Sequence, residues 1–427
     1  MDIRVSPSRL SGALDAVSSK SAAHRLLVCA ALAGKGTRVR INGISDDIQA
    51  TIRCLELMGA EIKIEKQEAV VRPIQRPVDG LASAPLGVLR CGESATAARL
   101  LMPVAAALFD SFSMTGEGTL PMRPLAPLCL ALQQAGCKLD GDRLPLAGSG
   151  RITAGDFHVP GDISSQFVSG LLLALPLLSA ESRVRITTPL ESASYVKMTV
   201  EAIAFFGIAI EKNEEGYRVI GNRRYDSPGV AVAEGDWSNS AFFLCMGALG
   251  APGCSVTVRG LAPRSEQGDK KIVEILRRFG ASVQTDETSV TVSRGALRGI
   301  SIDAAQIPDL VPALAVVASL AEGESKIYNA RRLHFKESDR LQSTRSMLLS
   351  LGADVKPIPD GLAIRGKKKL RGGEVSCARD HRIVMAAATA ACACEKPVVV
   401  KDFLAVNKSY PAFFGHYKTL GGFADVF

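Results

Sequence analysis

The stretch SSKSAAHRLLVCAALAGKGTRVRI, residues 18–41, joins a polar start, an apolar segment of helical length and an alternating strand. Five later stretches repeat this plan. The first polar residues of the six copies are spaced by 74, 71, 74, 71 and 71 residues and are Ser19, Glu93, Ser164, Ser238, Asp309 and Asp380. A solenoid of stacked repeats is the alternative, but solenoid repeats usually span about 20–50 residues.

A second, amphipathic helix follows each copy and ends at a glycine. These glycines keep nearly the same period and are Gly59, Gly136, Gly207, Gly280, Gly352 and Gly421. Glycine there suits the left-handed residue that follows a helix. Each unit is therefore predicted to run strand, helix, strand, helix, strand, strand. The six units divide into two similar α/β domains of three repeats, one over residues 17–233 and the other over 1–16 and 234–427.

Composition excludes several classes of protein. The 427 residues are 47% hydrophobic and 22% charged, which is typical of a globular chain and not of a disordered one. The longest apolar stretch, residues 167–180, is too short to span a bilayer, and residues 1–12 lack a signal-peptide pattern. We therefore expect a cytoplasmic protein without membrane contact.

The net charge of +8 raises the question of an anionic partner. The densest basic runs, GKKKLR at 366–371 and NRRYD at 222–226, contain a single aromatic residue, Tyr225, and not the repeated alternation of basic and aromatic residues that stacks on bases. Solvated loops explain them better than a nucleic-acid surface does. The ten cysteines show no metal-ligand spacing, and AGKGTRVR at 33–40 lacks the full phosphate-loop pattern. We expect no metal site and no nucleotide cofactor.

Cations recur near the predicted helix starts in both halves of the chain. They are Lys20, Arg25, Arg123, Lys336, Arg340, Arg382 and Lys408. The positive end of a helix already attracts anions, and Lys or Arg strengthens such a site for phosphate and carboxylate. One such cation is unremarkable, but their repetition at similar positions predicts several anion sites.

Short motifs make the chain resemble the 5-enolpyruvylshikimate-3-phosphate synthase family of enolpyruvyl transferases. SSKSAAHR resembles the family's GSKSxxxR, and later family motifs follow in the same order as GDISSQF, SASY, IPD, KESDR, DHR and NKSYP. The resemblance covers about residues 10–415 and implies two hinged α/β domains with the active site in the interdomain cleft. It also implies transfer of the enolpyruvyl group of phosphoenolpyruvate to the 5-hydroxyl of shikimate 3-phosphate, with release of phosphate, by a monomer.

The resemblance also assigns residues. For shikimate 3-phosphate it implies Lys20, Ser21, Arg25, Ser164, Ser165, Gln166, Ser192, Tyr195, Asp309 and Lys336. For phosphoenolpyruvate it implies Lys20, Ala95, Arg123, Gln166, Arg340, Arg382 and Lys408. The implied catalytic residues are Asp309, which takes the hydroxyl proton, Glu337, the acid near the methylene carbon, and Lys20, which touches both substrates. A hydroxyl nucleophile needs a base, carbon protonation needs an acid, and an anionic substrate needs cations.

The chain departs from the family pattern in two places. The common NAGT is replaced by Glu93, Ser94, Ala95 and Thr96, which places an acid and an extra methyl group at the phosphoenolpyruvate wall. Arg332 stands where an asparagine often contacts shikimate 3-phosphate, so no contact is assigned to it.

Two other functions remain as alternatives. The sister transferase that acts on UDP-N-acetylglucosamine usually has a reactive cysteine in the loop matching residues 116–127, where this chain has Arg123 and no cysteine. A nucleic-acid-binding protein would show salt-dependent binding to single or double strands.

The methyl group of Ala95 gives a first testable prediction. In the family, the herbicide glyphosate occupies the phosphoenolpyruvate site in an extended form, and the added methyl should crowd this longer molecule more than the substrate. We expect Ala95→Gly to lower the inhibition constant for glyphosate by about 10- to 200-fold, the usual effect of one methyl-sized contact. Inhibition assays against phosphoenolpyruvate check this, and equal constants in the two proteins would show that the methyl does not control sensitivity.

Overall fold

A computed structural model describes residues 1–75 and 86–427. The chain folds into two compact units: unit 1 is Met1–Ser19 with Glu234–Phe427, and unit 2 is Lys20–Ala233. The chain thus leaves unit 1 after Ser19 and returns after Ala233, where the sequence placed these changes after residues 16 and 233.

The described part of unit 2 contains three repeats, each with a four-stranded sheet. The first repeat consists of β14 (Val230–Val232), α1 (Lys20–Leu32), β3 (Thr37–Arg40), α2 (Asp46–Leu57), β4 (Glu61–Glu65) and β5 (Glu68–Arg72). The second consists of β6 (Val88–Arg90), α3 (Ala95–Leu108), β7 (Ser111–Thr115), the 3-10 helix η1 (Leu120–Met122), α4 (Ala126–Gln134), β8 (Lys138–Leu139) and β9 (Leu146–Ser149). The third consists of β10 (Asp156–Val159), α5 (Ser165–Ala174), η2 (Leu175–Leu177), β11 (Ser182–Ile186), α6 (Ala193–Phe205), β12 (Glu211–Lys212) and β13 (Gly216–Val219).

Unit 1, all of which is described, has the same plan. Its first repeat consists of β2 (Gly12–Asp15), α7 (Trp237–Leu249), β15 (Ser255–Arg259), η3 (Gly268–Lys271), α8 (Ile272–Phe279), β16 (Ser282–Thr285) and β17 (Ser289–Ser293). The second consists of β18 (Ser301–Asp303), η4 (Pro308–Leu310), α9 (Val311–Ala318), β19 (Glu324–Tyr328), η5 (Arg331–Phe335), α10 (Arg340–Ser350), β20 (Asp354–Ile358) and β21 (Gly361–Arg365). The third consists of β22 (Gly373–Ser376), α11 (His381–Ala391), β23 (Val398–Lys401), η6 (Phe403–Lys408), α12 (Phe413–Thr419), β24 (Phe423–Val426) and β1 (Ile3–Ser6).

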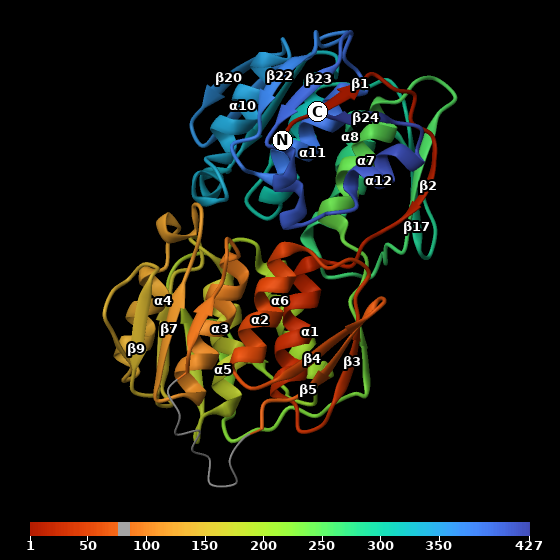
Figure 1. The fold of residues 1–427 in the computed structure, drawn as a ribbon. Helices are drawn as coiled ribbons and strands as arrows, with labels where there is room; N and C mark the ends of the chain where they lie inside the picture. Colours follow the sequence, from red (N-terminus) through yellow and green to blue (C-terminus); the bar gives the residue numbers. More distant parts are fainter. Residues whose placement is uncertain (76–85) are drawn as a thin grey trace. The chain divides into compact units, whose positions relative to one another are not determined.

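Segments far apart in the sequence complete three of these sheets. Strand β1 lies between β23 and β24, so both ends of the chain belong to one sheet of unit 1 (Figure 1). Strand β2 pairs with β15, and β14 supplies the first strand of the first repeat in unit 2. The predicted repeat plan is confirmed. In three repeats, one of the strands (β1, β2 or β14) comes from a distant part of the chain.

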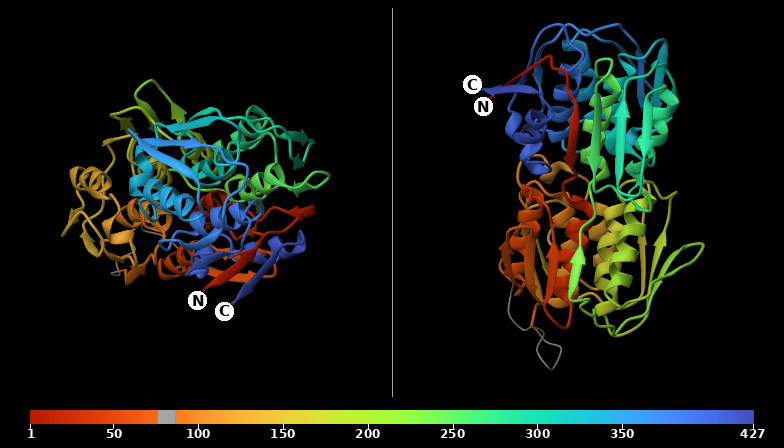
Figure 2. Two further views of the ribbon diagram at one scale, coloured as in Figure 1. Left: turned by 90° about the horizontal axis from the view of Figure 1, so that it is seen from above. Right: turned by 90° about the vertical axis from the view of Figure 1, so that its right-hand side faces the viewer.

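Apolar helices form the core of each unit and lie between its sheets (Figure 2). Every residue of α7, α9 and α11 is buried, which explains why their sequences are apolar on all sides. The second helix of each repeat ends as predicted, because the six periodic glycines all have positive φ, between 83° and 106°. A residue with a Cβ adopts this left-handed conformation only with strain.

The polar helix starts lie at one edge of each sheet, where the preceding strands end. Within a repeat, the first two strands are parallel, as in β6 with β7 and β18 with β19. The loops that follow two parallel strands leave the sheet side by side, and in α/β proteins such loops commonly bind ligands. The predicted site residues in 91–95, 115–125 and 303–310 therefore lie at carboxyl ends of parallel strands.

Helices α3 and α5 approach each other closely at Gly170. A Cβ built on Gly170 would lie 2.1 Å from the carbonyl oxygen of Arg99 on α3. Only glycine therefore permits this distance between the two helices. On α12, by contrast, a Cβ on the exposed Gly415 would meet nothing within 4 Å.

This difference predicts opposite effects of one substitution. We expect Gly170→Ala to lower the free energy of unfolding by about 1–3 kcal/mol through overpacking. Gly415→Ala should leave it unchanged or raise it by about 0.5–1 kcal/mol, because alanine favours helix over glycine. Denaturant unfolding of both variants measures this, and an unaffected Gly170→Ala protein would contradict the close approach of α3 and α5.

Candidate active site

Arg25 is held from several sides in unit 2. Its Nε donates to Thr199 Oγ1 at 2.7 Å, its Nη1 to the Ser21 carbonyl at 2.7 Å and its Nη2 to the Tyr195 carbonyl at 2.8 Å. Burial lowers the pKa of Arg25 to about 10, so the guanidinium stays charged near neutral pH. The structure thus brings the predicted residues Ser21, Arg25 and Tyr195 together.

Lys20 and His24 share helix α1 with Arg25 but differ in charge. The Lys20 Nζ forms an ion pair with Asp47 Oδ2 at 2.7 Å. Burial lowers the pKa of His24 to about 3, so the ring is neutral, and its Nδ1 shares a hydrogen bond of 2.7 Å with Thr51 Oγ1. Only Lys20 and Arg25 therefore offer positive charge from this helix start.

A second group in unit 2 is centred on the buried Arg99. Its Nη1 donates to Ser164 Oγ at 3.3 Å and to Gln166 Oε1 at 3.0 Å, and its Nη2 donates to the Pro124 carbonyl at 2.7 Å. The Gln166 Nε2 donates to Thr96 Oγ1 at 2.8 Å. Arg99 thereby fixes two predicted substrate contacts, Ser164 and Gln166, without having been predicted itself.

The other predicted residues of unit 2 lie on four separate elements. Ala95 is the first residue of α3 and is 4% exposed, while Ser165 is the first residue of α5. Ser192 precedes α6 in a left-handed conformation with φ of 52°. Arg123 directly follows η1 and is half-buried.

In unit 1, Arg340 joins three carboxylates. Its Nε lies 2.9 Å from Asp380 Oδ2, its Nη1 lies 2.8 Å from Asp309 Oδ1, and its Nη2 bonds Glu337 Oε2. The side chain of Arg340 is 1% exposed and that of Asp380 is completely buried. Burial alone would lower the pKa of Arg340, but Asp380, Glu337 and Asp309 raise it above its usual value.

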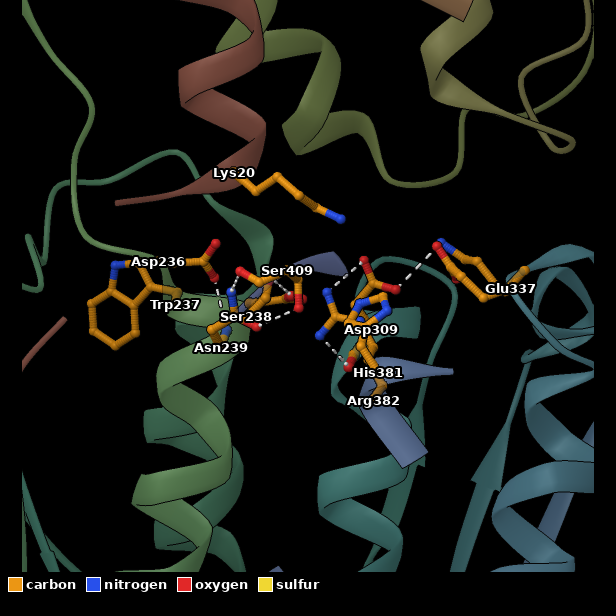
Figure 3. Close-up of polar contacts among 12 residues, drawn as sticks. Lys20, Asp236, Trp237, Ser238, Asn239, Asp309, Glu337, His381, Arg382 and Ser409 are labelled. Atoms are coloured by element: carbon orange, nitrogen blue, oxygen red, sulfur yellow. Dashed lines mark hydrogen bonds and ion pairs between the residues drawn. The ribbon is translucent and has the colours of Figure 1, made fainter. Parts of the chain in front are cut away.

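Asp309 has two further cations beside it, and Figure 3 shows it facing Arg382. Its Oδ2 lies 3.3 Å from Arg382 Nη2 and its Oδ1 lies 3.4 Å from Lys336 Nζ. Burial favours the neutral acid, but Arg382, Lys336 and Arg340 prevail and hold the pKa of Asp309 well below its usual value. Burial lowers the pKa of Lys336 to about 8, although Asp309 acts in the opposite direction. Asp309 is therefore a carboxylate at neutral pH.

A neighbouring polar group lies at the start of α7 (Figure 3). Asp236 caps the helix by accepting from the Asn239 backbone N–H at 2.7 Å. The Asn239 Nδ2 donates to the Ser409 carbonyl at 3.4 Å, which ties this helix start to the residue after Lys408. Lys408 is 5% exposed, so it is a buried cation.

Beside this cap, Ser238 donates a hydrogen bond to Asp269. Burial raises the pKa of Asp269 to about 7, and the nearby carboxylate of Asp309 acts in the same direction. Unit 1 thus holds one carboxyl group that stays ionised and another that takes up a proton near neutral pH.

At two of the predicted cations, Lys408 and Arg123, no α-helix begins where the sequence predicted one. Lys408 ends the 3-10 helix η6, and α12 begins only at Phe413. Arg123 lies between η1 and the start of α4 at Ala126. Proline explains both differences, because Pro411 and Pro124 disfavour helical backbone in the residues that precede them.

Sequence reasoning missed several residues that hold the predicted ones in place. Asp380 bonds Arg340, Asp47 bonds Lys20, and Arg99 bonds Ser164. Asp380 and Asp47 could have been found as acids at helix starts that also contain cations. Arg99 could have been found because it is a charged residue inside an otherwise apolar helix.

The residues that the structure describes contain neither a metal-ligand cluster nor a membrane-spanning helix. In residues 1–75 and 86–427, no group of three or more His, Cys, Asp or Glu side chains could hold a metal ion. Across the same ranges, each helix is too short or too polar to cross a membrane.

Comparison with known proteins gives relatives along the whole chain. Residues 5–416 match the family profile described as EPSP synthase (3-phosphoshikimate 1-carboxyvinyltransferase). A 3-phosphoshikimate 1-carboxyvinyltransferase of Clostridium perfringens is 40% identical over 98% of this chain and 98% of its own length. The protein of the same name from Clostridium novyi is 38% identical over 99% of this chain and 98% of its own length.

Solved structures share the fold. An EPSP synthase from Acinetobacter baumannii has a TM-score of 0.82 at 24% identity, with 100% of both chains covered. The enolpyruvyl transferase NikO from Streptomyces tendae has a TM-score of 0.78 at 16% identity, with 99% of this chain and 98% of its own covered. From the profile match and the clostridial relatives, the chain belongs to the EPSP synthase (3-phosphoshikimate 1-carboxyvinyltransferase) family.

Proposed function

We propose that this chain transfers the enolpyruvyl group of phosphoenolpyruvate to the 5-hydroxyl of shikimate 3-phosphate and releases phosphate. Family membership supports the reaction, since the clostridial relatives carry the name of this activity. The observation that carries the proposal is the position of Asp309, an ionised carboxylate within 2.8–3.4 Å of Arg340, Arg382 and Lys336. This arrangement combines a base with the cations that an anionic substrate needs.

The family resemblance assigns residues to each substrate. Shikimate 3-phosphate is bound by Lys20, Ser21, Arg25, Ser164, Ser165, Gln166, Ser192, Tyr195, Asp309 and Lys336. Phosphoenolpyruvate is bound by Lys20, Ala95, Arg123, Gln166, Arg340, Arg382 and Lys408. The hydroxyl groups and the positive helix ends at the starts of α1 and α5 suit a phosphate, and the guanidinium groups suit a carboxylate and a phosphate together.

The cations beside Asp309 make its basicity depend on the substrate. Without an anion, Arg382, Lys336 and Arg340 hold the pKa of Asp309 so low that it is a weak base. A bound phosphoenolpyruvate takes up these cations and adds negative charge, and both effects raise that pKa. Asp309 therefore becomes an effective base when its proton donor, the 5-hydroxyl, and the second substrate are both bound.

The reaction follows from addition and elimination. Asp309 removes the hydroxyl proton as the oxygen attacks C2 of phosphoenolpyruvate, while Glu337 gives a proton to the methylene carbon. The double-bond electrons form the new C–H bond. Phosphate then leaves with the electrons of its C–O bond and takes up the proton held by Asp309, and a methyl proton returns to Glu337 as the double bond is restored. Arg340 bonds both Asp309 and Glu337, so it holds the two proton-transfer groups in one arrangement.

Phosphate release tests this proposal, with Asp309→Asn as the matched variant. We expect turnover with phosphoenolpyruvate plus shikimate 3-phosphate and none with UDP-N-acetylglucosamine as acceptor. Asp309→Asn should bind both substrates but lower turnover by about 10²- to 10⁴-fold, because the amide keeps the shape and lacks the basicity. Activity only with UDP-N-acetylglucosamine would assign the chain to the sister reaction, and near-normal turnover of Asp309→Asn would remove its role as base.

The pKa of Lys336 predicts how kcat/KM for shikimate 3-phosphate depends on pH. Its pKa of about 8 means that it is charged below pH 8 and loses its charge as the pH rises through this value. A phosphate monoester is already fully ionised there, since its second pKa is about 6. We therefore expect kcat/KM for shikimate 3-phosphate to fall above pH 8. Lys336→Arg should abolish this fall, since arginine keeps its charge. Parallel pH profiles from 7 to 9.5 check this, and the same fall in both proteins would exclude Lys336 as its source.

A further inference from the structure

Glu93 lies where two loops of the second repeat meet. Strands β6 and β7 are parallel, with Arg90 opposite Thr115, so the loops after them leave the sheet side by side. Backbone hydrogen bonds join these loops: the Cys91 N–H donates to the Thr115 carbonyl at 3.0 Å, and the Glu117 N–H donates to the Gly92 carbonyl at 2.7 Å. The first loop contains Glu93, and the second leads to Arg123.

The Glu93 carboxylate lies directly against Gly118. A Cβ built on Gly118 would lie 1.3 Å from Glu93 Oε1 and 2.4 Å from its Cδ. The carboxylate therefore occupies the space that any larger residue at position 118 would need. Gly118 also has a φ of 57°, the left-handed conformation that glycine adopts without strain. The Glu93 carboxylate thus fills the space that the missing side chain of Gly118 leaves.

Hydrogen bonds continue from this contact to Arg123. The Leu120 N–H donates to the Glu117 carbonyl at 3.0 Å, and the Arg123 N–H donates to the Leu120 carbonyl at 3.1 Å. The side chain of Leu120 is buried, which anchors the turn in the core. On the far side of Arg123, Arg99 bonds the Pro124 carbonyl at 2.7 Å. The loop therefore contacts Glu93 before Arg123 and is bonded by Arg99 after it.

We propose that Glu93 is a positioning residue for phosphoenolpyruvate binding, which acts by holding the Gly118 turn and so the guanidinium of Arg123. The inference rests on the proposed function, in which Arg123 binds phosphoenolpyruvate. The simpler alternative is that an acid at this wall repels the anionic substrate. The two ideas predict opposite signs, because loss of a repelling charge improves binding whereas loss of a support weakens it.

The first experiment compares three variants in steady-state kinetics. We expect Glu93→Ala to raise KM for phosphoenolpyruvate by about 10- to 100-fold, the usual effect of a misplaced binding group, with KM for shikimate 3-phosphate unchanged within about 2-fold. Glu93→Gln keeps an oxygen of the same reach and should stay within about 3-fold of the original KM. Glu117→Ala removes an exposed carboxylate from the same loop and controls for charge alone.

The second experiment is a double-mutant cycle with Gly118→Ala. This substitution should raise KM for phosphoenolpyruvate about 10-fold while Glu93 is present. In the Glu93→Ala background it should add less than about 3-fold, because the new Cβ no longer meets the carboxylate and only the strain of the left-handed backbone at position 118 remains. Circular dichroism verifies the fold of each variant. If Glu93→Ala does not fold, Glu93→Gln and Gly118→Ala carry the test without it.

The outcomes separate this inference from the proposed function. An unsubstituted chain without turnover would refute the function. Normal turnover combined with an unchanged or lower KM in Glu93→Ala would overturn the role of Glu93 alone. A KM for phosphoenolpyruvate that falls in Glu93→Gln, or that stays unchanged in Gly118→Ala, would also overturn the role of Glu93. Equal effects of Gly118→Ala in both backgrounds would show that Glu93 does not act through Gly118.

Discussion

The structure depends on burying the polar starts of apolar helices. The first backbone N–H groups of a helix have no partner within it, so side chains must accept from them when the helix is buried. Asp236 and Asp380 do this in unit 1, and Ser94 and Ser164 do it in unit 2. The remaining N–H groups and the helix dipole favour anions. The requirement that stabilises the core thus also creates places where phosphate and carboxylate groups bind.

The two units surround their buried helix starts with different charged residues. Unit 1 uses aspartates and balances them with arginines, so that Lys336, Arg340 and Arg382 face Asp309, Glu337 and Asp380. Buried ion pairs of this kind often cost stability compared with apolar packing, and removal of one partner costs more. Unit 2 instead sets Arg25 and Arg99 among hydroxyl and carbonyl oxygens. The neutral oxygens that contact Arg25 leave its positive charge available to an anion.

Periodicity predicted the fold well because each repeat must bury the same apolar helix and end its second helix with the same left-handed residue. The six glycines illustrate this, since their backbone conformation depends on local sequence. The helix starts near Lys408 and Arg123 were predicted less well, because nearby prolines change short 3-10 segments without disturbing the periodic pattern.

Within the site, residue types were predictable but their partners were not. The sequence predicts Arg340 as a cation at an anion site, yet only the packing of α9, α10 and α11 determines that it bonds Asp309 and Asp380 together. Glu93 is a stronger example. Its side chain looks like a repelling charge in the sequence, and its contact with Gly118 arises only from the parallel pairing of β6 with β7.

The position of β1 means that this strand can pair only late in synthesis of the chain. This strand contains residues 3–6 but pairs with residues 398–400 and 423–426. At the usual rate of about 5–20 residues per second, a ribosome needs about 20–80 s between the two parts. Until then the N-terminal segment has neither neighbour, whereas Lys20–Ala233 is already continuous. A nascent chain is therefore exposed longest at its beginning, where chaperone protection of an unpaired strand matters most.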